Sequence, residues 1–312
     1  MEVNYALSWA SEWLSSAGIE NPYLESTVLL SYLLKKGRSY LYSHPSLQLS
    51  SFELEEFSNM IEKRAKHYPL AYIVGEKEFM SLPFMVNENV IIPRIETEIL
   101  VEETLKLINS GQRTAESAQK GRIKNSPLIP TCWTGRTHHS KLLDIGTGCG
   151  NIALSLAKYN RNLHVYAVDV SSSALDVAGE NRRRLSLEDS VSLIICNLWD
   201  YFKHRRWKGQ IDFIVTNPPY VCTNDLHRLA PEVLYEPEEA LDGGKDGLTF
   251  YPPLIEAGEF LLKKGGYLLM EVGEGQAEKV RKKVEETESF EEVYLRRDYS
   301  GTERVVIARR KK

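Results

Sequence analysis

The segment Asn217-Pro218-Pro219-Tyr220 directly follows an apolar run that ends at Thr216. Proline has no N–H and a fixed φ, and it pushes the preceding residue into extended geometry, so this segment is stiff and its prolines present only carbonyl oxygens. Asn217 Oδ1 and a main-chain carbonyl therefore form a pair of acceptors beside the Tyr220 ring. Such a pair suits a planar –NH2 group, as on a glutamine side chain, adenine or cytosine. Asn-Pro alone also starts ordinary turns after buried strands, so the assignment depends on the motifs around it.

The second motif is a glycine-rich turn, Gly146-Thr147-Gly148-Cys149-Gly150, between an apolar run that begins at Leu142 and the apolar start of a predicted helix. Glycine permits backbone conformations closed to other residues and lets a ligand approach the main chain. The spacing is G-x-G-x-G, whereas a dinucleotide fingerprint would need its third glycine at the position of Asn151. No G-K-[ST] sequence follows the turn, which excludes a P-loop.

An acidic residue, Asp169, ends the next predicted strand, about 20 positions after the turn. In open α/β sheets a carboxylate at this place accepts hydrogen bonds from ribose hydroxyls. A glycine-rich turn by itself is weak evidence for a ligand site. The turn, Asp169 and Asn217–Tyr220 in this order predict an S-adenosylmethionine-dependent methyltransferase of the Rossmann-like type.

The composition of the 312-residue chain is that of an ordinary globular protein, with 42% hydrophobic and 26% charged residues, and its length favours two domains. The net charge of −4 weakens any function that depends on gripping long duplex nucleic acid. The cysteines, at positions 132, 149, 196 and 222, form no C-x-x-C pair, so we expect no metal site and reduced thiols in the cytoplasm. We see no signal peptide and no apolar run of the ~18–20 residues that a membrane span needs.

The first 75 residues are predicted to form a helical domain that binds a macromolecular substrate. The first helix should end before Gly18, and the second should begin at Asn21-Pro22, with Asn as cap and Pro at the first position. Ser50 and Glu53 form a capping box for a third helix that ends near Lys66. The tryptophans and tyrosines of this domain are expected in its core. The side chains that the second helix should bury are Leu24, Val28 and Tyr32, with Leu29 as a further candidate.

Residues 76–92 are predicted to form a β-hairpin linker, preceded by a short strand at Ala71–Gly75. The methyltransferase domain should cover 93–312 and begin with a helix from Pro93 to about Asn109. The polar segment 109–140 is predicted to be an irregular, mobile insertion, because it is long for a loop in a compact domain.

From residue 141 the chain alternates between predicted strands and helices, which indicates a mostly parallel sheet covered on both faces. The strands are 141–145, 164–170, 191–196, 211–216 and 266–272, and the helices are 150–158, 173–184, 248–263 and 275–287. The tail Tyr299–Ile307 should form a hairpin at the edge of the sheet. Ligands in such sheets bind beyond the carboxyl ends of the strands, so we expect the glycine turn, Asp169, Asn197 and Asn217–Tyr220 to line one cleft.

With these residues placed, nearly the whole chain resembles the release factor glutamine methyltransferase family (the HemK/PrmC type). Pro93–Glu98 and Glu236–Leu241 separate this family from DNA methyltransferases that share only Asn-Pro-Pro-Tyr. The other motifs are Pro69–Gly75, Glu78-Phe79, Leu82–Phe84, Ile92, the glycine turn, Asn217–Tyr220, Tyr235, Asp246–Leu248, Glu271–Gly273 with Gln276, and Asp298 to Val306.

The resemblance implies a mostly parallel seven-stranded Rossmann-like core behind a small all-helical N-terminal domain. It implies that the protein uses S-adenosylmethionine to methylate the side-chain nitrogen (N5) of the glutamine in the Gly-Gly-Gln motif of class 1 peptide chain release factors. The implied catalytic residues are Asn217, Pro218, Pro219 and Tyr220; the cofactor-binding residues are Asp144, Gly146, Thr147, Gly148, Gly150, Asp169, Val170, Asn197, Leu198 and Asn217; and the substrate-binding residues are Asn217, Pro218, Tyr220, Phe79, Arg94 and Glu96.

The chain departs from the family pattern at a few places. Asn197 stands where many members have aspartate near the adenine, but asparagine also accepts a hydrogen bond from the adenine amino group, so we expect cofactor binding to be kept. Ile95 replaces a more usual proline, and the 109–140 segment is longer than typical bacterial members carry.

Three other functions stay open at this point. An adenine-N6 DNA methyltransferase would place the same kind of amino group in the cleft after base flipping, although we see no target-recognition domain and no basic balance. A related enzyme acting on a glutamine of another translation protein would share the same core. A non-catalytic S-adenosylmethionine-binding protein would not need the intact Asn217–Tyr220 motif. We expect a monomer with a protein substrate, no stable nucleic-acid partner and no membrane partner.

Overall fold

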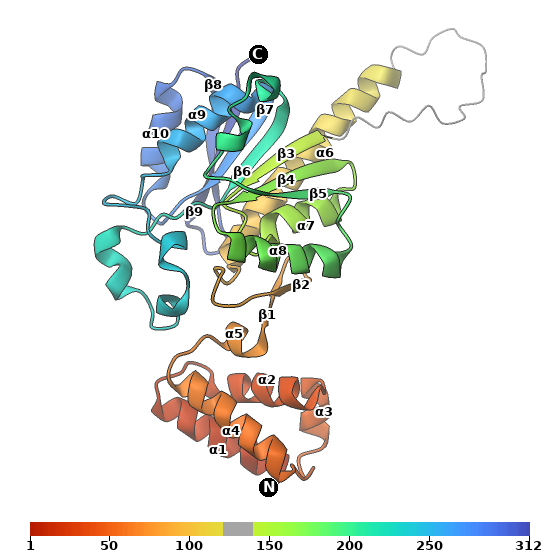
Figure 1. Cartoon of the computed structure of the whole chain (residues 1–312), viewed down its shortest axis with the longest axis vertical. Helices are drawn as coiled ribbons and strands as arrows, with labels where there is room; N and C mark the ends of the chain where they lie inside the picture. The colour runs from red at the N-terminus through yellow and green to blue at the C-terminus, as the bar shows by residue number, and fades with distance from the viewer. Residues whose placement is uncertain (121–139) are drawn as a thin grey trace, which may run out of the picture.

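The computed structural model describes residues 1–120 and 140–312, and it begins with a helical region over residues 1–75 (Figure 1, red to orange). The helices of this region are α1 (Val3–Ser16), α2 (Pro22–Leu34), α3 (Arg38–Ser43), α4 (Ser51–Ala65) and α5 (Leu70–Val74). The predicted capping box of α4 is present: Ser50 Oγ accepts the Glu53 N–H at 3.2 Å, and a Glu53 carboxylate oxygen accepts the Ser50 N–H at 2.7 Å. Asn21 precedes α2 as predicted, but its side chain makes no capping hydrogen bond.

The buried face of α2 differs from the prediction. Its buried residues include Ser26 and Thr27, whereas Leu24 is 45% exposed and Tyr32 is 47% exposed. The two hydroxyls donate to the carbonyl oxygens four residues earlier, at 2.8 and 2.7 Å, so small polar residues are satisfied inside the closely packed helices. Leu29, the further candidate, is fully buried, so hydrophobicity indicated the buried face only in part. The tryptophans and tyrosines of this region were predicted to be in the core, but most of them are exposed: Trp9, Trp13, Tyr5, Tyr23 and Tyr42.

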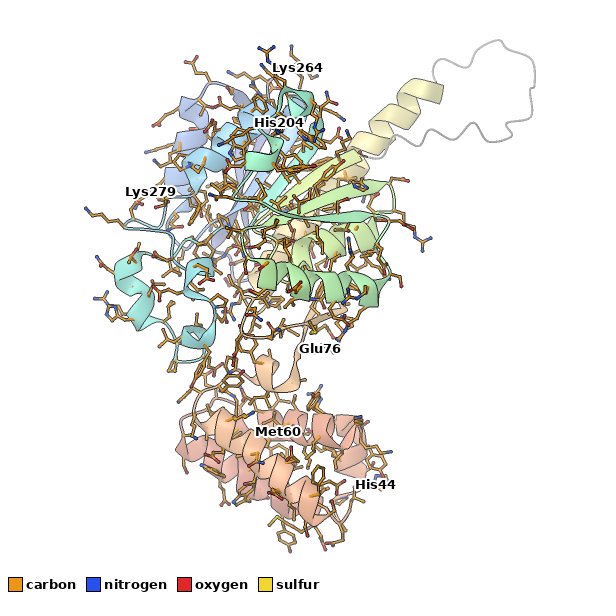
Figure 2. All side chains as sticks on the ribbon, viewed as in Figure 1. His44, Met60, Glu76, His204, Lys264 and Lys279 are labelled. Atoms are coloured by element: carbon orange, nitrogen blue, oxygen red, sulfur yellow. The ribbon has the colours of Figure 1, made fainter. Side chains whose placement is uncertain are left out.

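The passage from the helical region to the sheet begins with a helical turn where a strand was predicted. The β-branched Ile73 and Val74 favour a strand, but Pro69 O accepts the N–H groups of Tyr72 and Ile73 and starts α5, which ends at Gly75 with a φ of 74°. The hairpin that follows pairs β1 (Glu76–Phe79) with β2 (Leu82–Met85). In Figure 2, Met60 marks the helical region and Glu76 the start of this hairpin.

Seven strands form one sheet in the order β5-β4-β3-β6-β7-β9-β8. Their bounds are β3 (Ser140–Ile145), β4 (Leu163–Asp169), β5 (Val191–Ile195), β6 (Ile211–Thr216), β7 (Leu262–Glu271), β8 (Phe290–Arg297) and β9 (Glu303–Arg310). Strands β3 to β7 are parallel, and β9 runs antiparallel to both β7 and β8. The predicted fold class is confirmed. The terminal hairpin is longer than predicted, because its first strand begins at Phe290 rather than in the tail itself.

Helices cover both faces of the sheet, and alternate residues of each strand bury toward opposite layers. Leu142, for example, packs into the layer formed with α6 and α7, and Leu143 into the layer formed with α9 and α10. The helices are α6 (Glu98–Lys120), α7 (Asn151–Tyr159), α8 (Ser172–Leu185), α9 (Tyr251–Leu261) and α10 (Ala277–Glu286). The 3-10 turns are η1 (Ile95–Thr97), η2 (Asp200–Phe202), η3 (Arg205–Trp207), η4 (Thr223–Arg228), η5 (Val233–Tyr235) and η6 (Glu238–Ala240).

The prediction for residues 109–140 was partly wrong. Helix α6 does not end near Asn109 but continues to Lys120, and Ser140 already belongs to β3. Good helix formers such as Gln112, Arg113 and Ala115 continue the helix even though the segment is polar. The remainder of the predicted insertion, 121–139, lies outside the described residues.

Candidate active site

A cavity lies beyond the carboxyl ends of β3, β4, β5 and β6, where the sequence placed the cleft. Its walls include residues from four loops: Gly146, Thr147 and Gly148; Asp169 and Val170; Asn197 and Leu198; and Asn217, Pro218 and Pro219. Arg94 and Thr97 contribute from the segment before α6, and Pro237, Glu239 and Ala240 from the loop around η6. The predicted loops therefore converge on a single site.

The glycine-rich turn exposes its main chain to this cavity. Gly146, Gly148 and Gly150 have φ values of 74°, 55° and 85°, which disfavour other residues. A Cβ built on Gly146 or Gly148 would meet nothing within 4 Å, so open space lies above both. At Gly150, by contrast, a Cβ would lie 2.9 Å from Leu154 Cδ1. Gly150 therefore permits close packing behind the turn and does not line the cavity.

Asp144 supports the turn from below and is not among the residues that line the cavity. Its side chain is fully buried at the end of β3, where Thr147 Oγ1 donates to Oδ2 at 2.7 Å. Burial raises the pKa of Asp144 to about 7, against the lowering effect of the Thr147 hydrogen bond. Asn181 of α8 adds a second support, because its amide donates to the carbonyls of Cys149 and Met85 at 2.9 and 3.0 Å.

Asp169 lines the cavity and also fixes the glycine-rich turn. One carboxylate oxygen accepts the Gly148 N–H at 2.8 Å and the other accepts the Ser171 N–H at 3.0 Å. Each oxygen has a further lone pair, so these bonds leave acceptor capacity for a ligand. Val170, next along the chain, is 64% exposed and adds apolar surface.

The Asn217 motif is held from both sides. Thr216 Oγ1 donates to Ile145 O at 2.7 Å, which ties the end of β6 to the end of β3. Asn217 Nδ2 donates to Thr97 Oγ1 at 3.2 Å. Asn217, Pro218 and Pro219 line the cavity as predicted from the sequence.

Tyr220 is not among the residues that line the cavity, and its role as a wall for the substrate stays a prediction. Its carbonyl accepts the Gln276 Nε2–H at 2.9 Å, and its hydroxyl hydrogen-bonds Glu271. Burial raises the pKa of Tyr220 to about 12, so it stays protonated at neutral pH.

Two glycines let the following loop close over Tyr220. A Cβ on Gly243 would lie 2.7 Å from Tyr220 Cα, and one on Gly247 would lie 2.4 Å from Tyr220 O. Both distances are shorter than a Cβ contact allows, so the loop reaches this position only with glycine. The same loop carries Glu239 to the cavity wall; Glu239 belongs to the family motif Glu236–Leu241 but was not among the predicted site residues.

Two buried carboxylates lie beside the cavity. Glu236 pairs with Arg94, with 2.5 Å between Oε1 and Nη2, and burial raises its pKa against the lowering effect of Arg94. Burial raises the pKa of Glu271 to about 7, while hydrogen bonds from Thr97 and Tyr220 and the charge of Arg304 act in the opposite direction. Glu96, predicted to contact substrate, is not among the cavity residues and instead adds negative charge near Glu271.

Phe79 was also predicted to contact the substrate, and the structure places it elsewhere. Its side chain is 1% exposed, and its ring packs edge-on against Phe84 with 6.1 Å between centroids. Both rings belong to the apolar layer under α6 and α7. Phe79 is the buried residue at the end of β1, whose three preceding residues are exposed, so it packs inward where the hairpin meets the apolar layer.

The helical region is joined to the loop that reaches the cavity. Arg64 of α4 is 2% exposed and forms ion pairs with Glu25 of α2 and Glu232, which lies between η4 and η5. Tyr235 Oη donates to Lys66 O at 3.0 Å. A protein bound to the helices would therefore lie next to the cavity loop.

Within residues 1–120 and 140–312, no three His, Cys, Asp or Glu side chains gather as metal ligands, and no helix has the length and apolarity to cross a membrane. The fold and the converging loops define a Rossmann-like S-adenosylmethionine-dependent methyltransferase. Among solved structures, the catalytic domain of hMettl16 in complex with an RNA hairpin covers 85% of this chain and 84% of its own, with a TM-score of 0.52 and 14% identity. That likeness shows the fold alone.

Relatives by sequence identify the family. The family described as PrmC N-terminal domain matches residues 5–75, and the one described as Methyltransferase small domain matches 126–272. Release factor glutamine methyltransferases of Geobacter sulfurreducens and Moorella thermoacetica are 36% and 35% identical, over 98% and 100% of this chain and 96% and 99% of their own. A bifunctional methyltransferase of Rickettsia felis is 35% identical over 98% of this chain, which spans only 57% of that protein. The chain belongs to the release factor glutamine methyltransferase (PrmC) family.

Proposed function

We propose that this protein transfers a methyl group from S-adenosylmethionine to the side-chain N5 of the glutamine in the Gly-Gly-Gln motif of class 1 release factors. The observation that carries the proposal is the stiff acceptor segment Asn217–Pro219 on the wall of the cavity, beside a helical region of the PrmC type. The names of the relatives support the choice of substrate. We also propose that the enzyme works in the cytoplasm as a monomer.

The cavity suits S-adenosylmethionine. Open space above Gly146 and Gly148 lets the amino-acid end of the cofactor approach main-chain groups, and the Asp169 carboxylate accepts from ribose hydroxyls. Asn197 can accept from the adenine amino group, and Val170 and Leu198 supply apolar surface for the base. Thr147 lines the cavity, and Asp144 keeps the turn in shape through its hydrogen bond with Thr147. When bound, the cofactor supplies an electrophilic methyl group.

The protein acts chiefly by orienting the glutamine nitrogen. A carboxamide nitrogen is a poor nucleophile because its lone pair is delocalised into the carbonyl. Asn217 Oδ1 and the Pro218 carbonyl would accept its two N–H groups, which turns the lone pair toward the methyl group. Alignment of two bound reactants can lower a barrier by about 7–11 kcal/mol. The partial negative charge of the two acceptors also favours the positive charge that develops on nitrogen.

Of the remaining predicted site residues, some line the cavity and others act indirectly. Arg94 lines the cavity and is the candidate for substrate contact, since its partner Glu236 is buried behind it. Pro219 keeps the segment rigid. Tyr220 and Glu96 lie near Glu271, which supports an indirect role for both in this proposal. The extra proton on nitrogen leaves after transfer, so the site needs no strong general base.

Methyl transfer from labelled S-adenosylmethionine tests the proposal. The acceptors are a purified class 1 release factor, the same factor with its Gly-Gly-Gln glutamine changed to alanine, and unmethylated DNA. Label on the intact factor only is the expected result. Label on DNA would instead establish the adenine-N6 methyltransferase alternative. Label on neither, with cofactor still bound, would contradict this substrate and direct the search to a glutamine of another translation protein.

A further inference from the structure

We propose that Thr97 is a positioning residue that holds the Asn217 side chain in the one orientation that leaves Oδ1 available as an acceptor. The inference rests on the proposed function for the identity of the group that Oδ1 accepts from. Thr97 was part of a recognised motif but was not among the predicted site residues. Its side chain is 1% exposed at the end of η1, and it lines the cavity next to Asn217.

The orientation of an asparagine amide is a choice between two states. A half-turn about the last side-chain bond exchanges Oδ1 and Nδ2 at almost no change in shape, so hydrogen bonds decide which atom faces which neighbour. In this structure Nδ2 donates to Thr97 Oγ1 at 3.2 Å. The atom left for a substrate is then Oδ1. The opposite orientation would present Nδ2 to the substrate –NH2 group, and two donors would face each other.

Thr97 can enforce this choice because its own hydrogen is already committed. A hydroxyl has one hydrogen to donate and two lone pairs to accept with. The Glu271 carboxyl group is a polar neighbour of Thr97, whose hydroxyl favours its ionised form, and an ionised carboxylate only accepts hydrogen bonds. The Thr97 hydrogen therefore goes to Glu271, and Asn217 meets a lone pair. Only Nδ2 can donate to that lone pair. The protonation state of Glu271 therefore determines the orientation of the Asn217 amide, and it does so through the Thr97 hydroxyl.

The surroundings of Glu271 determine when this chain of bonds holds. The neighbours of Glu271 come from four elements. They are Tyr220 of the Asn217 motif, Glu96 and Thr97 of the segment before α6, Arg304 of β9 and Tyr251 of α9. Of these, Arg304 favours the carboxylate and Glu96 disfavours it. Because burial raises its pKa to about 7, Glu271 gains a proton in mildly acidic solution. A protonated Glu271 can donate to Thr97, which frees the Thr97 hydrogen and removes the preference for Nδ2.

Substitution of Thr97 tests the proposal. Thr97→Val keeps the shape and removes the hydroxyl, and Thr97→Ser keeps the hydroxyl. We expect Thr97→Val to lower kcat for the release factor by about 10- to 100-fold, the size expected of lost alignment, with S-adenosylmethionine affinity within about 2-fold of wild type. Thr97→Ser should restore most of the rate. Unchanged kcat in Thr97→Val, or equal losses in both variants, would overturn the proposal.

A matched control separates positioning from folding. Thr104 lies on α6, is fully buried, and donates to Leu100 O at 2.7 Å. Thr104→Val should leave kcat unchanged while altering the melting temperature as any lost buried hydroxyl does. The pH profile gives a further readout: wild-type kcat should fall below about pH 7, and this fall should vanish in Glu271→Gln. A fall that persists in Glu271→Gln would overturn the role given to Glu271.

A measurement without substrate distinguishes failure of this inference from failure of the proposed function. In protein labelled with ¹⁵N-asparagine, the Asn217 side-chain NH2 pair is identified by its loss in Asn217→Ala. This pair should shift in Thr97→Val and stay in place in Thr97→Ser. If wild type labels no release factor, the proposed function fails, and the NH2 shift alone still decides the positioning role. A pair that does not move in Thr97→Val would overturn it.

Discussion

Arg94 and Glu236 are 142 positions apart in the chain and meet across the rim of the cavity, with 2.5 Å between the guanidinium and carboxylate atoms. The Glu236 side chain is 1% exposed, whereas that of Arg94 is 35% exposed. The pair joins the segment before η1 to the loop that follows η5. One partner is therefore buried as an anchor, and the other keeps a face toward the cavity.

Arg94→Met should destabilise the protein and impair substrate binding together. Removing the guanidinium leaves the Glu236 carboxyl buried without its partner, which typically costs about 3–5 kcal/mol. Urea unfolding at neutral pH measures the loss. Arg228→Met provides a control, because Arg228 pairs only with Asp225 on the surface and should change stability little. Equal stability of the two variants would contradict the anchoring role of the pair.

Asn217→Ala should abolish turnover and leave S-adenosylmethionine affinity nearly unchanged, because the side chain orients the acceptor nitrogen rather than the cofactor. Calorimetry of cofactor binding and a labelled-methyl assay measure the two effects separately. The exposed Asn224 of η4 offers the same substitution outside the cavity, and Asn224→Ala should be fully active. Normal turnover in Asn217→Ala would refute the mechanism.

Asp169→Ala should weaken cofactor binding because the Asp169 carboxylate has two roles. The variant loses the acceptor for the ribose hydroxyls, and it also releases the Gly148 N–H that shapes the turn. Loss of hydrogen bonds to a charged group corresponds to about 1.5–3 kcal/mol, or roughly 10- to 150-fold in affinity. Asp176→Ala on the exposed side of α8 is the matched control. Cofactor affinity equal to that of wild type would exclude Asp169 from the site.

Glu271→Gln should become more stable relative to wild type as the pH rises. The folded-state pKa of about 7 lies above the value of about 4.3 in an unfolded chain, so the folded protein binds this proton more tightly. The contribution of Glu271 to stability is therefore full below about pH 4.3 and is lost as the pH rises through about 7. Asp144, whose pKa is also raised to about 7, contributes equally to both proteins and cancels in the difference. Melting temperatures from about pH 5 to 8 measure the trend, and a constant difference would contradict the raised pKa.

Phe79→Ala should lower stability and leave the KM for the release factor unchanged in the fraction that remains folded. The ring lies in the apolar layer under α6, and truncation of a buried phenylalanine costs about 3–5 kcal/mol. Urea unfolding and steady-state kinetics together distinguish this role from the substrate contact that the sequence suggested. A raised KM with unchanged stability would restore the substrate contact.

Much of the catalytic core followed from local sequence patterns. Apolar runs gave the parallel strands, and the motifs at their ends converge because parallel strands place their carboxyl ends at one edge. The misplaced residues share a different cause. Tyr220 and Phe79 have the right composition for a substrate wall, but which side chains line the cavity depends on tertiary packing that no spacing reveals. Thr97 and Glu239 were missed because their roles arise from distant contacts.

In the helical region, too, local sequence patterns predicted some features and not others. Hydrophobicity predicted the buried face of α2 only in part. Leu29 is buried as expected, but Ser26 and Thr27 satisfy their hydroxyls within the helix and are buried, whereas Leu24 and Tyr32 are not. The run from Ala71 to Gly75 favours a strand by residue type, but the Pro69 carbonyl and the left-handed Gly75 define a single helical turn. The capping box at Ser50 was predictable because both of its partners are local in sequence.

The glycines that face Tyr220 have a consequence for mutational studies of this enzyme. Gly243 and Gly247 carry no side chain that could bind or react, yet almost any substitution there would push the loop off Tyr220 and displace the acceptor segment with it. In a map of every single substitution, these two positions would stand out as strongly as Asn217 itself. Activity data alone would then suggest that these glycines take part in the chemistry, although they contribute only by having no side chain that would collide with Tyr220.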